Sequence, residues 1–366
     1  MGNSASLPND LGTIQRNDLT KLLVVTLGDP YSINVESVLG ALSTLTLPCS
    51  LPVVMVGSYW QWNLQLDALL SMSSFSLSDS FSRLLADIKL VRRWNEVGPD
   101  GFYFLDVCPS RLAADSLSME ERGYIACSSL QALEPLMDGV KSYDVKLAVV
   151  TCPINKKACE MAGFTYPGQT EYFGDLWGTD PIMVLAGPKL KVGLATNHMA
   201  LNDIPEAISE DLIVNKARLL VETLSEVYDI PKPKIAICGL NPHCGDHGLF
   251  GAEDTDIIEP AVKMLRSLGF DAHGPFPADT IFFQGYCGEW DGILAMYHDQ
   301  GLGPLKTVHF YDAVNMSGGM PYFRVSPDHG PASELYLKGK ARYDSVILSF
   351  RHAFRFLSGA ACESLQ

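Results

Sequence analysis

The sequence predicts an α/β fold with two domains. Short apolar runs such as KLLVVT, LPVVMVG and VKLAVVT have the branched, uninterrupted character of strands that are buried on both faces. Stretches with helical character follow many of these runs, an alternation that is typical of a largely parallel sheet covered by helices. The 366 residues exceed the size at which one hydrophobic core usually stops growing. We therefore expect two α/β/α domains with a central cleft.

The first half of the chain opens as a β-α-β unit. The run KLLVVTLGD predicts a strand, 35–45 a helix and LPVVMVG a second strand. The Ser-rich segment 64–93 is consistent with helix plus loop. A long amphipathic pattern predicts a helix over 119–141, and NKKACEMAG predicts a helix that Gly163 stops.

The second half alternates more regularly between apolar runs and helical stretches. Helices are predicted at three places, which are 202–228 in pieces, 254–268 and 331–340. The expected division of the chain is a flexible leader over 1–20, a first domain formed by 21–160 with 331–366, and a second domain over 161–330.

Composition and charge exclude several classes of protein. The 42 acidic and 27 basic residues give a net charge of −15, which repels polyanions and offers no basic stripe to nucleic acid. No apolar run approaches the roughly 18 residues that a membrane span needs, and the start MGNSASLPNDLG lacks the apolar core of a signal peptide. The nine cysteines form no CxxC pair, so neither a zinc ribbon nor a complete disulfide framework is indicated. We expect a cytoplasmic protein that binds neither nucleic acid nor membrane.

Three histidines close three of the apolar runs. VGLATNH ends at His198, KIAICGLNPH at His243 and DGILAMYH at His298. Because the carboxyl ends of parallel strands lie along one edge of a sheet, we expect the three imidazoles to meet there. Three neutral nitrogen ligands leave a coordination position open on a divalent cation, as catalytic sites require. The pattern predicts a metal-dependent enzyme.

Two further segments carry groups suited to anions. The glycine-rich stretch 239–254 surrounds His243 with backbone amides that can approach an anion or a cofactor closely. Lys306, Asn315 and Arg324 follow His298 and suit a phosphorylated or carboxylated substrate, although such residues are often solvated surface charges. Neither the Rossmann glycine fingerprint nor a P-loop occurs, so any nucleotide is held in another way.

Together these motifs resemble the 4-hydroxythreonine-4-phosphate dehydrogenase family of vitamin B6 biosynthesis. The similarity rests on TLGDP, TCPINK, PGQTE, TNHMALNDIPEAI, GLNPHCGDHGLFGAED, GPFPADTIF, AMYHDQGLGPLK and PYFRVSPDHG, which together span residues 26 to 330. The resemblance implies a fold like that of isocitrate and isopropylmalate dehydrogenases. It also implies a homodimer whose active site lies at the subunit interface and is completed by the partner.

The resemblance also implies roles for individual residues. The metal ligands would be His198, His243 and His298, holding one Zn, Mg or Co ion, and the cofactor would be NAD or NADP. The implied substrate contacts are Gln169, Thr170, Lys306, Asn315 and Arg324. Lys306, Asp279 and a metal-bound water all remain candidates for the general base.

The chain departs from the family pattern at three places. Gln169 stands where the family has a histidine that contacts the substrate, and an amide cannot ionise. Tyr31 occupies a turn that is usually small and glycine-rich, and Asp246 replaces a glutamate near His243. These departures concern the identity of the substrate more than the chemistry.

The expected reaction is the oxidation of 4-hydroxythreonine 4-phosphate to 2-amino-3-oxo-4-phosphooxybutanoate, which decarboxylates to 3-amino-2-oxopropyl phosphate. A dehydrogenase of the same family could instead act on a four-carbon sugar-acid phosphate or on a cyclic dihydrodiol. The same residues would also suit a metal-dependent hydrolase or lyase, or a non-catalytic paralogue that only binds ligand. Formation of NADH with any candidate substrate would argue against a hydrolase or lyase, and turnover with stoichiometric metal would exclude the non-catalytic paralogue.

Overall fold

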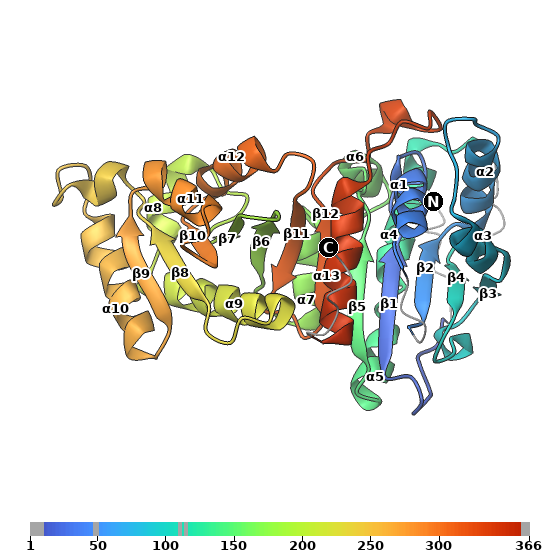
Figure 1. The fold of residues 1–366 in the computed structure, drawn as a ribbon, viewed down its shortest axis with the longest axis horizontal. Helices are drawn as coiled ribbons and strands as arrows, with labels where there is room; N and C mark the ends of the chain where they lie inside the picture. Colours follow the sequence, from blue (N-terminus) through green and yellow to red (C-terminus); the bar gives the residue numbers. More distant parts are fainter. Residues whose placement is uncertain (1–10, 47–50, 109–111, 113–115, 360–366) are drawn as a thin grey trace. The chain divides into compact units, whose positions relative to one another are not determined.

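The computed structural model describes residues 11–46, 51–108, 112 and 116–359, which form two compact units. The first unit combines the described part of Met1–Leu176 with Tyr322–Gly359, and the second is Trp177–Pro321. In Figure 1 the first unit therefore contains both the blue N-terminal strands and the red C-terminal helix. One unit is thus built from both ends of the chain, and the other from its middle.

The first unit has a fully parallel sheet in the order β3-β4-β2-β1-β5-β12. Its central strand β1 pairs on both sides, since Leu23 is in register with Val53 of β2 and with Ala148 of β5. The strands are β1 Lys21–Thr26, β2 Val53–Gly57, β3 Lys89–Val91, β4 Phe102–Asp106, β5 Lys146–Thr151 and β12 Phe323–Pro327. The uninterrupted apolar character of β1 and β5 thus reflects burial on both faces.

Helices connect the strands of this sheet. They are α1 Asn34–Thr44, α2 Tyr59–Leu70, α3 Asp79–Ala86, α4 Met119–Gln131, α5 Leu136–Ser142, α6 Lys156–Met161, α7 Gln169–Trp177 and α13 Asp344–Ser358, with 3-10 turns η1 Trp94–Glu96 and η6 Ser333–Leu335. Local capping sets several starts: Ser118 and Glu121 form a capping box at α4, and Asn155 caps α6 through the backbone N–H of Ala158.

The second unit has a mixed sheet in the order β11-β6-β7-β10-β8-β9. Strand β6 is antiparallel to both β11 and β7, whereas β7, β10, β8 and β9 run parallel to one another. The strands are β6 Ile182–Ala186, β7 Lys191–Leu194, β8 Lys234–Cys238, β9 Asp271–Phe276, β10 Gly292–Ala295 and β11 Val314–Gly318.

The helices of the second unit cover an apolar core. Val192, Ala236 and Ile293 from the sheet pack there with Ile281 and Leu305 from helices, and all five are fully buried. The helical elements are η3 Leu201–Asp203, α8 Ile204–Ala207, α9 Glu210–Tyr228, η4 Pro242–Gly245, the π-turn η5 Asp254–Ile258, α10 Glu259–Ser267, α11 Ala278–Tyr286 and α12 His298–Val308.

The two units divide at other residues than the sequence suggested. The expected limits were 160/161 and 330/331, whereas the units change at Leu176/Trp177 and Pro321/Tyr322. The reason for the second difference is β12, which pairs in parallel with β5 and so belongs to the first sheet. Residues 11–20 of the expected flexible leader are also packed, because Leu11, Ile14 and Leu19 are buried. The remainder of that leader, and residues 360–366, lie outside the described part.

The structure also corrects two predicted helices. The pattern over 119–141 forms the separate helices α4 and α5, which meet around Pro135. The segment 331–340 contains only the 3-10 turn η6, and Ala332 and Leu337 adopt left-handed backbone conformations that interrupt a helix. Helix α13 was not predicted. In contrast, the expected helix 35–45 is confirmed as α1.

Candidate functional site

The three predicted histidines follow three neighbouring strands of the second unit. Strand β10 lies between β7 and β8 and is parallel to both, so the three carboxyl ends face the same edge of the sheet. His198 follows β7, His243 follows β8, and His298 begins α12 directly after β10. The strand-end arrangement inferred from the apolar runs is therefore present.

Two of the three imidazoles lie together. The ring centroids of His198 and His298 are 5.4 Å apart, and both residues line a cavity of about 350 Å³ with Asn197, Tyr297 and Asp299. Two imidazoles that share one tetrahedral ion, each with a nitrogen about 2.1 Å from it, have centroids about 5 Å apart, so the pair fits a common cation.

Asp299 orients the His298 ring through a hydrogen bond. Its Oδ1 lies 2.6 Å from Nδ1 of His298. An ionised carboxylate only accepts hydrogen bonds, so Nδ1 is the donor in this contact and Nε2 is the nitrogen left to bind a metal. An outer carboxylate of this kind orients a ligating histidine. Asp299, which directly follows His298 in the chain, is thus a site residue that the sequence pattern did not single out.

His243 lies in a turn with an unusual backbone conformation. It begins a run of six residues with positive φ, from His243 to Gly248, four of which are not glycine. Such a run is strained, and such strain often lies at functional sites. The carboxylate of Asp254, which is 1% exposed, accepts the backbone N–H groups of Leu240 and Asn241 at 2.9 and 3.0 Å and so fixes the start of the turn.

The structure does not bring His243 to the other two histidines within one chain. His243 lines a separate cavity of about 370 Å³ with Cys244, His247 and Lys263 among others. In the described ranges, no group of three or more His, Cys, Asp or Glu side chains is placed to hold a metal ion. A single chain therefore offers a metal two imidazoles at one place and a third elsewhere.

The other expected residues of the second unit lie on three elements. Lys306 is half-buried in the last turn of α12, and Asn315 lies on β11 in register with Leu185. Asp279 is exposed in the first turn of α11.

Asp279 also influences a thiol near His243. Burial raises the pKa of the Cys244 thiol to about 11, and the nearby carboxylates of Asp254 and Asp279 add to that increase. Asp279 therefore acts electrostatically on the turn that carries His243.

Arg324 is the centre of a second cluster, in the first unit. The residue is 3% exposed, and its guanidinium donates to Thr151 Oγ1 from Nε and Nη2 at 3.1 and 2.8 Å. Nη1 also donates to Thr170 Oγ1 at 2.9 Å. Burial lowers the pKa of Arg324 to about 10, which the charge of Glu171 opposes, so the group remains cationic at neutral pH.

Gln169 joins this cluster through both ends of its amide. Its Nε2 donates to the carbonyl of Cys152 at 3.0 Å, and its Oε1 accepts from Nη2 of Arg324 at 3.3 Å. Gln169 and Thr170 are the first two residues of α7, where unpaired backbone N–H groups favour an anion. The cluster thus places a buried cation at a helix N-terminus, with neutral oxygens and the charge of Glu171 near it. Its hydrogen-bond donors suit a phosphate or a carboxylate.

The strand ends of β5 and β12 bring this cluster together. Arg324 is in register with Val149, and Thr151 is the last residue of β5. Sequence reasoning missed Thr151, although a hydroxyl at the end of the apolar run VKLAVVT is a signal that could have found it.

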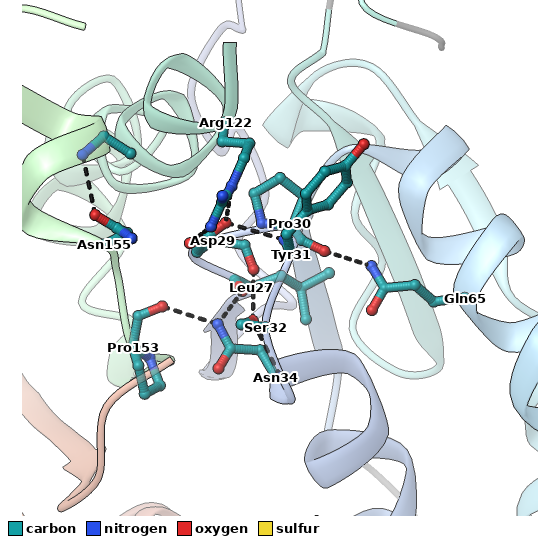
Figure 2. Close-up of polar contacts among 11 residues, drawn as sticks. Leu27, Asp29, Pro30, Tyr31, Ser32, Asn34, Gln65, Arg122, Pro153 and Asn155 are labelled. Carbon is teal, nitrogen blue, oxygen red and sulfur yellow. Dashed lines mark hydrogen bonds and ion pairs between the residues drawn. The ribbon is translucent and has the colours of Figure 1, made fainter. Parts of the chain in front are cut away.

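The side chains of the loop after β1 contact residues of other segments. Figure 2 shows the buried carboxylate of Asp29 facing Arg122, with two contacts of 3.1 and 2.6 Å. Tyr31 stacks on Tyr336 with ring centroids 5.1 Å apart, and the Arg122 guanidinium lies 5.1 Å from the Tyr31 ring centroid. The Tyr31 hydroxyl accepts the backbone N–H of Leu117 at 2.7 Å. The tyrosine therefore fills the space that a glycine-rich turn would leave open.

Known proteins resemble this chain over much of its length. A family model described as pyridoxal phosphate biosynthetic protein PdxA matches residues 105–353. The chain belongs to this family. A 4-hydroxythreonine-4-phosphate dehydrogenase of Bradyrhizobium diazoefficiens is 44% identical over 57% of the chain, and the match spans only 62% of that relative. A D-threonate 4-phosphate dehydrogenase of Salmonella typhimurium is 34% identical over 92% of the chain and 99% of the relative.

Among solved structures, the PdxA-family chain is similar to a 4-hydroxythreonine-4-phosphate dehydrogenase from Klebsiella pneumoniae. The two share 31% identity with a TM-score of 0.74, and the match covers 92% of this chain and all of that one. The α/β fold that the apolar runs predicted is thereby confirmed.

In the described part of the chain, no helix is both long enough and apolar enough to cross a membrane.

Proposed function

We propose that this PdxA-family chain is a dehydrogenase that uses NAD or NADP and one divalent metal ion to oxidise 4-hydroxythreonine 4-phosphate. The product, 2-amino-3-oxo-4-phosphooxybutanoate, would decarboxylate to 3-amino-2-oxopropyl phosphate, a step toward pyridoxal phosphate. The observation that carries the proposal is the His198–His298 pair at the carboxyl edge of parallel strands, with Asp299 orienting one ring. The similarity to dehydrogenases that act on phosphorylated four-carbon compounds supports it.

The residues of the chain would divide the work of the reaction. A bound Zn, Mg or Co ion would acidify the substrate hydroxyl, while NAD or NADP would accept the hydride. Arg324 and Thr170 would hold the phosphate, and Lys306 and Asn315 would contact the same substrate. The hydroxyl proton would pass to Lys306, Asp279 or a metal-bound water, the three candidates for the general base.

We further propose that the chain works as a homodimer in which each site takes its third imidazole from the other subunit. The loops next to the histidines expose large apolar side chains: Met199 and Leu201 are 44% and 70% exposed, and Leu249 and Phe250 are 71% and 48% exposed. We propose that these four side chains form part of the subunit interface. An interface over both loops would bring the His198–His298 pair to His243 of the partner subunit.

A second candidate substrate is D-threonate 4-phosphate. The observation that favours it is Gln169, whose amide is held by Cys152 and Arg324 and which replaces an ionisable imidazole. The similarity over nearly the whole chain to a D-threonate 4-phosphate dehydrogenase points the same way.

A substrate panel followed by NADH absorbance tests the proposal. The panel compares 4-hydroxythreonine 4-phosphate with D-threonate and D-erythronate 4-phosphates, each with Zn²⁺, Mg²⁺ or Co²⁺. Preferred turnover of 4-hydroxythreonine 4-phosphate supports the proposed substrate. Robust turnover of D-threonate or D-erythronate 4-phosphate, with no turnover of 4-hydroxythreonine 4-phosphate, would assign that other compound as the substrate. An absence of NADH formation with every compound and metal would rule out the dehydrogenase.

A further inference from the structure

A buried amide connects two of the strand ends that carry the histidines. Gln300 is 8% exposed and lies in the first turn of α12, two residues after His298. Its Oε1 accepts the backbone N–H of Met296 at 2.7 Å, and its Nε2 donates to the backbone carbonyl of Gly239 at 2.7 Å. Met296 stands two residues before His298, and Gly239 begins the stretch that leads to His243.

The amide continues the sheet where the backbone pairing stops. Strands β10 and β8 pair in register up to Leu294 and Ile237. Two residues further along each strand are Met296 and Gly239, and there the Gln300 amide spans the strands with one acceptor and one donor. Because both of its hydrogen bonds are directed at backbone groups, the amide fixes the separation of the two chain segments beyond their last paired residues.

The segment after β7 is also hydrogen-bonded to Met296. The hydroxyl of Thr196 donates to the Met296 carbonyl at 2.8 Å, and Thr196 stands two residues before His198. Met296 is therefore held through its N–H by Gln300 and through its carbonyl by Thr196. Through these bonds the three histidine-bearing segments meet at one buried residue, Met296.

We propose that Gln300 is a positioning residue, which sets the distance between the strand ends that carry His298 and His243. This inference rests on the proposed metal-dependent function, in which these histidines are ligands. A buried amide that bonds only to backbone acts on the ligands through the strands, so its loss would disorder the ligand geometry without removing a ligand. Outer residues of this kind typically change metal affinity by about 10–100-fold.

Two substitutions and one control test the role. Q300M keeps the length of the side chain and removes both hydrogen bonds. Q300E keeps the acceptor for Met296 but places a carboxylate oxygen against the Gly239 carbonyl. The control Q284M, in the same unit, removes an acceptor that Trp290 Nε1 contacts at 3.2 Å, away from the histidine loops.

The first measurement is the set of histidine-ring signals in ¹H–¹⁵N NMR spectra of the metal-free protein. Q300M should shift the signals of His243 and His298 but not those of His273 and His352, whereas Q300E should shift His243 more than His298. The Q284M spectrum should match that of the wild type at His243 and His298, and only His273, whose ring centroid lies 5.5 Å from that of Trp290, should respond. Unchanged signals of His243 and His298 in both Gln300 variants would overturn the proposal, because the strand ends would then hold their places without the amide.

The second measurement is Co²⁺ affinity, followed by the absorbance of the bound ion. Q300M should weaken binding by about tenfold or more, and Q284M should leave it unchanged. Equal Co²⁺ affinity of Q300M and the wild type would also overturn the proposal. If the wild type itself bound no Co²⁺, the proposed function would fail, and the ring signals would still decide the role of Gln300.

Discussion

Nη1 of Arg324 donates to Thr170 Oγ1 at 2.9 Å, linking strand β12 to the first turn of α7 across 154 positions of sequence. The guanidinium is buried, and the oxygens of Thr151, Thr170 and Gln169 around it are neutral. A buried charge of this kind carries a desolvation cost that an anionic ligand offsets. The charge of Glu171 opposes part of this cost, and we propose that the phosphate of the substrate offsets the rest.

Replacing Arg324 by Lys should weaken binding of the phosphorylated substrate. Lysine keeps the charge but loses the planar fork that reaches Thr151 and Thr170 together. The loss of one or two charged hydrogen bonds, about 1.5–3 kcal/mol, corresponds to a 10–100-fold increase in KM. Steady-state NADH formation measures the change.

The control for R324K is the same substrate without its phosphate. If Arg324 binds the phosphate, the variant should lower kcat/KM much less for free 4-hydroxythreonine than for the phosphate ester. An equal loss for both compounds would assign Arg324 a structural role instead.

Q169E should abolish most of the phosphate affinity while sparing the fold. The new carboxylate would stand near Nη2 of Arg324, where Oε1 now lies at 3.3 Å, and would neutralise the charge that the phosphate needs. We expect KM to rise by about tenfold or more. Thermal unfolding should change little, because a counter-ion for Arg324 offsets the lost bond to the Cys152 carbonyl.

Q169N is the matched control for Q169E, since it is uncharged but too short to span Cys152 and Arg324. It should raise KM less than Q169E does. A KM for Q169E close to that of the wild type would show that no anion binds beside Arg324.

The sequence allowed the strand-end histidines to be predicted, because the burial of parallel strands leaves an apolar pattern and their carboxyl ends must share an edge. The separation of His243 from the other two could not be predicted. It depends on a left-handed turn whose strain is compensated by Asp254, a residue eleven positions away. Arg324 was expected as an anion ligand from its spacing, but its partners depend on the pairing of β12 with β5, which no local pattern encodes.

Mixed dimers test whether the third imidazole crosses the subunit interface. Homodimers of H298A and of H243A should both be inactive, because each lacks one ligand at every site. In a mixed dimer, the intact His198–His298 pair of one chain would face the intact His243 of the other. Half of the dimers in an equal mixture are mixed and each has one intact site, so about a quarter of wild-type activity should return.

A mixture of H298A with H198A is the control. Both variants damage the same pair, so no site in any mixed dimer is intact if His198 and His298 act from one chain. Activity in this mixture, or none in the H298A and H243A mixture, would contradict the proposed arrangement.

Glu36 should make the stability of the first unit depend on pH. Its carboxylate is 4% exposed, Oε1 accepts the backbone N–H of Ala341 at 2.7 Å, and Oε2 has no hydrogen-bond partner. Burial raises the pKa of Glu36, which the backbone N–H groups of Ala341 and Gly339 partly oppose. The folded state therefore binds the proton more tightly than the unfolded state does.

The sign of the effect follows from this raised pKa. The protonated carboxyl of Glu36 contributes to the free energy of unfolding. This contribution is fully present below the pKa that Glu36 has in the unfolded chain, and it is lost as the pH rises through its pKa in the folded state. E36Q cannot lose a proton, so its free energy of unfolding relative to the wild type should increase, on the order of 1 kcal/mol, between pH 4 and pH 7. Urea unfolding across this pH range measures the difference, and E206Q, which changes an exposed carboxylate, should follow the wild type. A constant difference between E36Q and the wild type at all pH values would show that Glu36 keeps its ordinary pKa despite its burial.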